Sequence, residues 1–521
     1  EWSSYLALSE ATRFKGAWSE FNSARKNWAY RQDQLSSTHP IIADMVDMEA
    51  VNANFDGITY AKGASVLHQL VAHVGRPQFI AGLQKYFAKH AWGNTTLDDL
   101  LVELEAASGR TLDSWVNTWL QTAGVNTLRP VLEIDGGAYK SITISQETPL
   151  IPVGSKELRP HRLAVGLYDI SGDSLKLRKS VELDVAGAST VVADLAGEKV
   201  ADLLLINDRD LSYAKLRFDD RSIATMKSHL GKLDDSLARG LIWASLWDSC
   251  RDGELSTSDY VAIALNALKT ESDISIVSAT YLQFETAIWA YANPSHRDAL
   301  RTQVADATGA SLATATPGSD HQMQFARAFA NNAITPAHFA KLKEILNGSE
   351  NGLVIDAEIR WYIFICGVKR GVFGPAEIEA ESAKDNTAHG KQYTARAYAS
   401  MPTKEAKSKA FLSITTDDLS NTIHSYTCLG FNENIHHEIL ADFVDPYFDS
   451  MLKVWETKGY EIAETTANLL FPSWVITSET LAKAEHWLNV TGKDASSALR
   501  RAITEGRDAM SRAMKARAAD K

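Results

Sequence analysis

The period of the hydrophobic pattern changes twice along the chain. Residues 1–126 and 213–521 carry apolar side chains at spacings of three and four, which is typical of amphipathic helices. Residues 127–212 instead alternate apolar and polar side chains, and turn signals such as Gly136-Gly137 separate the alternating runs. We therefore predict a mainly α fold with a small β-sandwich at 127–212, between helices at 1–126 and a large helical domain at 213–521.

The long C-terminal helical region shows no regular sequence repeat. Its predicted helices are separated by loops that contain Gly, Pro, Ser or Asp. Helices in such a series bury their apolar stripes against their neighbours, so we expect an irregular α-solenoid-like domain. Arg327, Arg360 and Arg370 are candidates for binding a carboxylate there, and the sequence does not select among them.

Composition narrows the class of protein. The 521 residues exceed what a single core holds, and a hydrophobic content of 45% with 23% charged residues is that of a globular protein. No apolar run approaches the roughly 18 residues of a membrane span, and a net charge of −12 argues against a nucleic-acid-binding surface. Cys250, Cys366 and Cys428 are far apart and odd in number, which predicts reduced, buried thiols and a cytoplasmic protein.

The clearest candidate for chemistry lies in residues 52–75, which read as one amphipathic helix. Asn54 or Asp56 can cap its start, and Gly75 ends it. Tyr60 lies in the first turns, where packing is the ordinary role of a tyrosine. Gly63 follows one turn later, although glycine inside a helix costs about 1 kcal/mol relative to alanine. That glycine suggests that another group approaches the helix closely beside the phenol.

The full string around Tyr60 carries a family resemblance. F-D-G-I-T-Y-A-K-G-A-S-V-L closely resembles the segment F-D-x-I-[S/T]-Y-x-K-G-[A/S] of the gluzincin zinc aminopeptidases of aminopeptidase N type. In that family the tyrosine donates its hydroxyl to the oxyanion formed at the scissile carbonyl, so the resemblance implies this catalytic role for Tyr60. Asn52 matches a family position beside the bound peptide backbone. The resemblance also implies that residues 1–126 are the C-terminal helical part of a thermolysin-like catalytic domain.

The zinc-binding motifs of that family do not occur in this sequence. The opening E-W-S-S-Y-L-A resembles the end of the segment after the metal site, so we expect the third zinc ligand and the HExxH motif to precede Glu1. The nearest internal match begins at His437, but Ala441 stands where the second histidine is needed. We interpret His436 and His437 as surface histidines. Zinc is therefore expected in the intact enzyme, and no metal ligand is expected in this chain.

Two functional hypotheses from different classes remain open. In the first, the chain is a portion of a zinc metalloaminopeptidase that hydrolyses amino-terminal residues from peptides, and it is inactive alone. In the alternative, it is a non-catalytic helical scaffold that binds peptides or proteins, which would explain the missing metal and nucleophile motifs. The Tyr60 segment and the order of the domains favour the first. Neither hypothesis includes a nucleic-acid or membrane partner, and the oligomeric state is not predicted.

Overall fold

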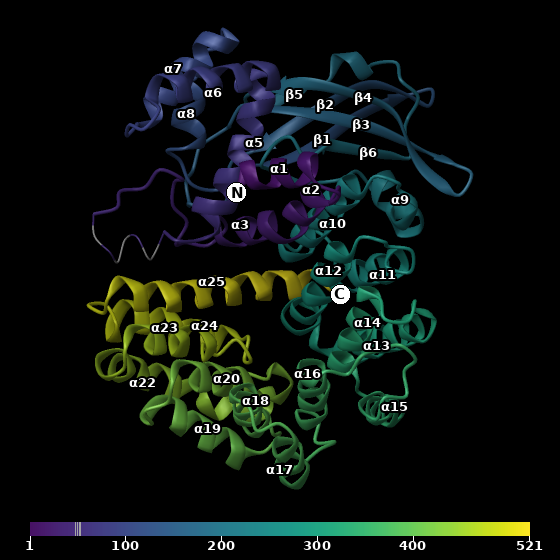
Figure 1. Cartoon of the computed structure of the whole chain (residues 1–521). Coiled ribbons are helices and arrows are strands. Elements are labelled where there is room, and N and C mark those ends of the chain that lie inside the picture. The colour runs from purple at the N-terminus through teal and green to yellow at the C-terminus, as the bar shows by residue number, and fades with distance from the viewer. Residues whose placement is uncertain (47, 49–50, 52–53) are drawn as a thin grey trace. The chain divides into compact units, whose positions relative to one another are not determined.

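The computed structural model describes residues 1–46, 48, 51 and 54–521. The described chain is mainly helical and contains two small sheets, which confirms the predicted fold class (Figure 1). It forms two compact units. The first consists of Glu1–Ser249 and Asn266–Ala279, and the second of Cys250–Leu265 and Thr280–Lys521. The boundaries of the three predicted domains stay a prediction.

The first unit begins with helices around one aromatic core. The core includes Trp115 and Trp119, which are 2% and 1% exposed. Trp119 also donates its indole N–H to the carbonyl of Pro160, at 2.9 Å. The helical segments, with η1 and η2 as π-helical turns, are α1 (Trp2–Ala11), α2 (Ala17–Glu20), η1 (Phe21–Lys26), α3 (Asn27–Gln32), η2 (Ile58–Lys62), α5 (Gly63–Val74), α6 (Arg76–His90), α7 (Leu97–Ser108) and α8 (Asp113–Trp119).

Two sheets follow in the chain. The first has the strand order β5 (Ser189–Val191), β2 (Ala138–Glu147), β1 (Thr127–Asp135) and β7 (Lys215–Leu216), and the second has the order β4 (Ser174–Val185), β3 (His161–Ser171) and β6 (Leu203–Asp208). Pairing is antiparallel except between β1 and β7. Gly136 and Gly137 form the tip of the β1–β2 hairpin at φ +58° and +82°, a backbone region that glycine adopts without steric cost.

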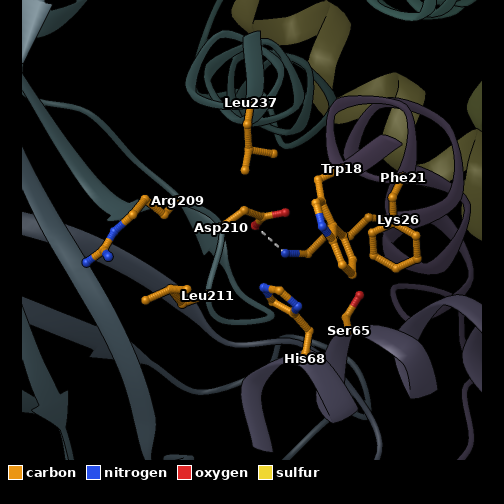
Figure 2. Close-up of a pocket in the computed structure, with 9 residues that line it drawn as sticks. All are labelled: Trp18, Phe21, Lys26, Ser65, His68, Arg209, Asp210, Leu211 and Leu237. Atoms are coloured by element: carbon orange, nitrogen blue, oxygen red, sulfur yellow. Dashed lines mark hydrogen bonds and ion pairs between the residues drawn. The ribbon is translucent and has the colours of Figure 1, made fainter. Parts of the chain in front are cut away.

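The segment after β6 contributes to a cavity in the first unit. Asp210 and Leu211 lie on one side of this cavity, and His68 of α5 lies on another (Figure 2). The same unit contains η3 (Ala193–Leu195), α9 (Asp220–His229) and η4 (Leu230–Lys232). Three helices each contribute residues to both units: α10 (Ser236–Arg251), α11 (Thr257–Ala267) and α12 (Ile274–Thr286).

In the second unit, helices that follow one another in sequence pack side by side. Contacts join α13 to α14, α15 to α16 and α17 to α18, which is the arrangement expected of a solenoid. The series is irregular, because α20 also contacts α23 and α23 contacts α25. The helical segments are η5 (Ala287–Tyr291), η6 (Pro294–His296), α13 (Arg297–Thr314), α14 (Asp320–Asn332), α15 (Pro336–Leu346), α16 (Ala357–Val368), α17 (Pro375–Lys384), α18 (Ala388–Ala399), α19 (Lys404–Thr416), α20 (Asn421–Phe431), η7 (Asn434–His436), α21 (His437–Leu440), η8 (Ala441–Phe443), α22 (Val444–Thr457), α23 (Tyr460–Leu469), α24 (Ser478–His486), η9 (Trp487–Thr491) and α25 (Ser497–Ala519).

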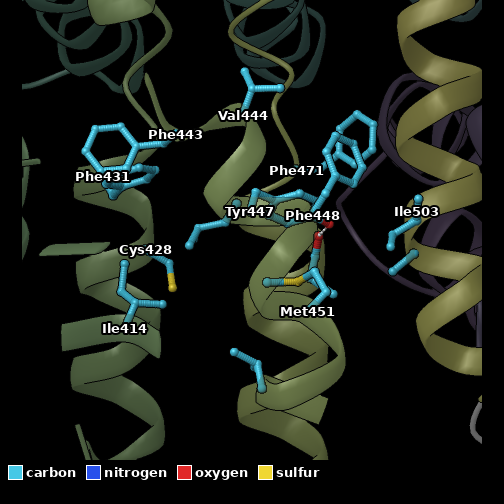
Figure 3. Packing of buried hydrophobic residues seen from close by; sticks show 14 of the residues in the cluster. Ile414, Cys428, Phe431, Phe443, Val444, Tyr447, Phe448, Met451, Phe471 and Ile503 are labelled. Carbon is cyan, nitrogen blue, oxygen red and sulfur yellow. Dashed lines mark hydrogen bonds between the residues drawn. The ribbon is translucent and has the colours of Figure 1, made fainter. Parts of the chain in front are cut away.

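The core of the second unit is rich in aromatic side chains (Figure 3). Phe431 and Phe443 meet edge to face, with ring centroids 5.2 Å apart. Tyr447 is fully buried and donates its hydroxyl to the carbonyl of Ala467, at 2.7 Å. Its one polar atom is therefore satisfied, as burial of a hydroxyl requires. All three cysteines are buried and reduced, as predicted.

Candidate functional site

Tyr60 lies in the π-helical turn η2, which leads directly into α5. Asp56 caps this turn, because its Oδ1 accepts hydrogen bonds from the backbone N–H groups of Ile58 (2.9 Å) and Thr59 (3.2 Å). The cap was predicted from the sequence, and the π-helical geometry was not. Turns of this kind inside α-helices occur frequently at functional sites.

The Tyr60 side chain is half-buried and its hydroxyl is uncommitted. No described residue forms a hydrogen bond with this hydroxyl. The ring meets the ring of Phe55 edge to face, with centroids 4.9 Å apart, and Phe55 itself is 68% exposed. The phenol is thus oriented by an aromatic neighbour and keeps its O–H free to donate to another molecule.

The turn is held in place by a buried ion pair. Lys62 Nζ lies 2.8 Å from Asp33 Oδ2, and neither side chain is exposed. The same ammonium donates to the carbonyl of Gly124, at 3.2 Å. Asp33 Oδ1 accepts from the Thr38 hydroxyl (2.6 Å) and the Gly124 N–H (2.8 Å). Burial lowers the pKa of Lys62, and the nearby Asp33 carboxylate opposes that shift. Sequence reasoning found the lysine as a motif residue but not its partner.

A second polar contact lies at the start of the turn. His39 Nε2 is 3.0 Å from Asp56 Oδ2, and His39 Nδ1 is 2.8 Å from the carbonyl of Pro40. Burial raises the pKa of Asp56, but the hydrogen bond and charge of His39 and the two backbone N–H groups outweigh it, so the pKa lies below its usual range. Asp56 is therefore a carboxylate at neutral pH. It joins the loop at His39 to the turn that carries Tyr60.

Two further residues of this region were singled out in the sequence, Asn52 and Gly63. Asn52 lies outside the described residues, so its proposed contact with a peptide backbone stays a prediction. Gly63 is the first residue of α5, at its junction with η2, and does not lie in the middle of one regular helix. A Cβ atom at Gly63 would meet no described atom nearer than 3.8 Å, which is ordinary contact. No described atom makes the close approach expected at this glycine, and the approach of another molecule there stays a prediction.

The described residues do not fit a zinc ion. Among them, no group of three or more His, Cys, Asp or Glu side chains is arranged to hold a metal. His437 is exposed, as predicted, but the prediction for His436 is wrong. His436 is 7% exposed. Its Nε2 forms a hydrogen bond with the backbone carbonyl of Lys369, at 2.7 Å. Lys369 is the C-cap of α16, and the last carbonyls of a helix have no partner within the helix.

The second unit contains a polar chamber of about 430 Å³, lined by Tyr362, Tyr393, Tyr426 and several charged residues. Arg327 lines it and pairs with Glu358, at 2.7 Å. Lys369 pairs with Glu433, at 3.3 Å. Arg396 also lines the chamber, forms no ion pair with any residue that the structure describes, and has a buried Nε without a hydrogen-bond partner.

The other arginines suggested by the sequence lie elsewhere in the second unit. Arg360 pairs with Glu381 and lines a separate pocket. Arg370 is largely enclosed, with buried Nε and Nη2 atoms that lack partners, and burial lowers its pKa to about 10. The sequence did not indicate Arg396, because nothing in its spacing distinguishes it from a surface arginine of α18.

Known proteins match both units of this chain. A family model described as the ERAP1-like C-terminal domain matches residues 203–512, and one described as the peptidase family M1 domain matches residues 1–119. Aminopeptidase N of Streptomyces lividans is 45% identical over 522 residues, which cover 99% of this chain and 61% of that protein. Tricorn protease-interacting factor F2 of Thermoplasma volcanium is 26% identical over 275 residues, 52% of this chain and 32% of that protein.

These matches first define the class of the protein. Its N-terminal part matches the M1 peptidase domain, and its larger helical part matches the ERAP1-like C-terminal domain. Within that class the chain belongs to the aminopeptidase N family. The chain spans about 61% of the length of the Streptomyces relative and 32% of the length of the Thermoplasma volcanium factor.

Proposed function

We propose that this chain is a portion of a zinc metalloaminopeptidase that removes residues from the amino ends of peptides, with Tyr60 as a catalytic hydrogen-bond donor. One observation carries the proposal. The Tyr60 hydroxyl is unbonded to any described residue, yet the turn behind it is anchored by the buried pair of Lys62 and Asp33. A hydrogen-bond donor that is free and held in a fixed orientation stabilises the negative charge that develops in the transition state.

The chemistry follows from where charge develops during peptide hydrolysis. When the scissile carbonyl is attacked, its oxygen becomes negative, and a neutral phenol near pH 7 donates a hydrogen bond to it. A donor that is already oriented stabilises the transition state more than the ground state, and this difference accelerates the reaction. Zinc is expected in the intact enzyme, but the described residues do not fit it, so we assign no step to it here.

A conservative substitution in the full-length protein tests the role of Tyr60. Tyr60→Phe should lower kcat by about 10²–10³-fold, because it removes one oxyanion donor, while the zinc content stays unchanged. Tyr86→Phe is the matched control, since Tyr86 is also half-buried in this unit but its hydroxyl bonds Thr95, at 2.6 Å. Wild-type turnover in Tyr60→Phe would remove Tyr60 from the mechanism.

A second measurement concerns this chain by itself. Because its sequence contains no HExxH motif, we expect no stoichiometric zinc by metal analysis and no release of amino-terminal residues from model peptides. One tight zinc per chain would overturn this part of the proposal. The three reduced, buried cysteines support a cytoplasmic location for the protein.

The scaffold alternative keeps one specific observation in its favour. The chamber of the second unit combines three tyrosines with Arg396, a cation that forms no ion pair with a described residue. Such a site suits the carboxylate of a peptide. Equilibrium binding of a peptide and of its C-terminal amide to the whole chain would test it. Tighter binding of the free acid, lost in Arg396→Gln, supports peptide capture, and equal binding of both forms rejects it.

A further inference from the structure

The first unit contains a cavity of about 210 Å³ beside α5 (Figure 2). Its apolar walls are Trp18 of α2, Phe21 of η1, Leu211 after β6 and Leu237 of α10, and His68 of α5 lies among them. For scale, an engineered cavity of about 150 Å³ lined by apolar side chains binds benzene. The space in this unit therefore admits a single aromatic ring or a fused pair of rings.

Two of the three charges at the wall of this cavity, Lys26 and Asp210, neutralise each other. The third, Arg209, pairs with Glu182 at 2.6 Å. Lys26 Nζ donates to Asp210 Oδ1 (2.5 Å) and to the carbonyl of Ser212 (2.8 Å), and both members of the ion pair are buried. Asp210 Oδ2 accepts in turn from the Asn22 amide, at 2.9 Å. A charged ligand would have to compete with this arrangement and lose its own hydration. The cavity thus favours a neutral molecule.

His68 offers a hydrogen-bond donor to such a molecule. The indole N–H of Trp2 is a donor only, and it lies 3.3 Å from His68 Nδ1, which must therefore accept. Burial lowers the pKa of His68 to about 4, so the ring is neutral at pH 7 and carries its proton on Nε2. Among the residues that the structure describes, none accepts a hydrogen bond from Nε2.

The loop that follows β6 also borders the cavity, and its backbone is held in a strained conformation. Asn207, Arg209 and Asp210 have positive φ values of 59°, 69° and 53°. Residues other than glycine rarely adopt such backbone angles. The Asn207 side chain accepts from the N–H and donates to the carbonyl of Ser212, each at 2.9 Å, and so maintains the loop. Strain of this kind clusters at ligand sites, because only the surrounding structure sustains it. Here it places Asp210 and Leu211 against the cavity.

We propose that this cavity is a binding site for a small, neutral aromatic molecule that packs against Trp18, Phe21 and Leu237 and accepts a hydrogen bond from His68 Nε2. The apolar walls and the volume specify the ring system. The Nε2–H of His68, which no described residue accepts, specifies one acceptor atom on it. The site is separate from the proposed role of Tyr60, although His68 lies two turns further along the same helical stretch.

Quinoline and naphthalene test the proposal, because they have the same shape and differ by one acceptor nitrogen. Ligand-observed NMR titration of the whole chain at pH 7.5 should show one saturable site for each. Quinoline should bind about 3- to 10-fold more tightly, which is the usual net effect of one neutral hydrogen bond. In His68→Phe the two affinities should become equal.

Two further substitutions locate the site. Leu237→Trp should fill the cavity and abolish binding, whereas Leu237→Met keeps the volume and should retain it. Leu211→Trp blocks the same space from another element, and thermal unfolding identifies any variant that fails to fold. Absence of saturable binding to the wild type, or binding that survives both blocking variants once they are folded, would overturn the site. Equal affinity for the two probes in the wild type would overturn the role of His68.

Discussion

Charged side chains lie both beside the Tyr60 turn and in the chamber of the second unit, but they are paired differently in the two places. Beside Tyr60, the charges of Lys62 and Asp33 are fully buried and paired at 2.8 Å. In the chamber, Arg396 forms no ion pair with a described residue, although tyrosines and other charged groups share the same walls. The first arrangement determines the position of a neighbouring group. The second leaves a charge available to water or to another molecule.

This difference separates charges that stabilise the structure from charges that are free to bind. Breaking a buried pair leaves one charge without water or partner, at a cost of roughly 3–5 kcal/mol. Removing Arg396, which forms no ion pair with a described residue, breaks no such pair. Stability measurements on single variants therefore distinguish the two regions without any knowledge of substrates.

The largest effect is expected from Lys62→Met, which leaves Asp33 buried without its partner. We expect a loss of about 3–5 kcal/mol in the stability of the first unit. Hydrogen exchange in residues 58–74, read by mass spectrometry, would report it, because opening of η2 and α5 becomes more frequent. Lys85→Met on the exposed side of α6 is the control and should change stability by less than about 0.5 kcal/mol. A loss below about 1 kcal/mol in Lys62→Met would show that the pair does not anchor the turn.

An intermediate effect is expected from pH, through His68 on the helix that continues from Tyr60. Its pKa is about 4 in the folded chain, against 6.5 for an ordinary histidine. Between these two values the unfolded chain binds the extra proton, so stability should fall as the pH decreases below 6.5 and should not depend on this group above it. From pH 7.5 to pH 5 the contribution is roughly 1–2 kcal/mol.

Urea denaturation of the wild type and of His68→Phe at both pH values isolates this contribution. The difference in stability between the two proteins should change with pH in the window from 6.5 towards 4. If the two proteins lose stability in parallel, the interior along α5 is not the dry environment that the structure indicates.

The smallest effect is expected from Arg396→Gln in the chamber. Because no described carboxylate pairs with this guanidinium, its replacement should change the stability of the second unit by less than about 0.5 kcal/mol. Urea denaturation followed by hydrogen exchange in α18 would measure it. A loss above about 2 kcal/mol would place Arg396 with Lys62 among the structural charges and would abolish the contrast between the two regions.

The sequence predicts much of the framework because local patterns determine it. The mainly α fold, the turn at Gly136-Gly137 and the Asp56 cap all follow from spacing and turn chemistry. The Tyr60 segment also stood out in sequence, through its resemblance to a known family. Its assignment as a catalytic donor stays a prediction until the variant is measured.

The partners of that segment were beyond sequence reasoning for a physical reason. Asp33 meets Lys62 through tertiary packing, and no period in the pattern joins positions so far apart. The sequence around His436 indicates a surface residue, because nothing in it shows the tertiary contact with the carbonyl of Lys369 at the end of α16. The position of Gly63 at the change from a π-helical turn to an α-helix was not predicted, because that change depends on backbone geometry that hydrophobic spacing does not record.

The complete enclosure of Lys62 and Asp33 has a consequence for the solvent in which the protein is handled. Dissolved ions weaken attraction between charges that they can surround, as at the partly exposed pair of Arg162 and Glu182. They cannot enter the space between two groups with no accessible surface. The orientation of the Tyr60 phenol should therefore be the same in dilute buffer and at high ionic strength, while contacts along the exposed face of the sheet loosen.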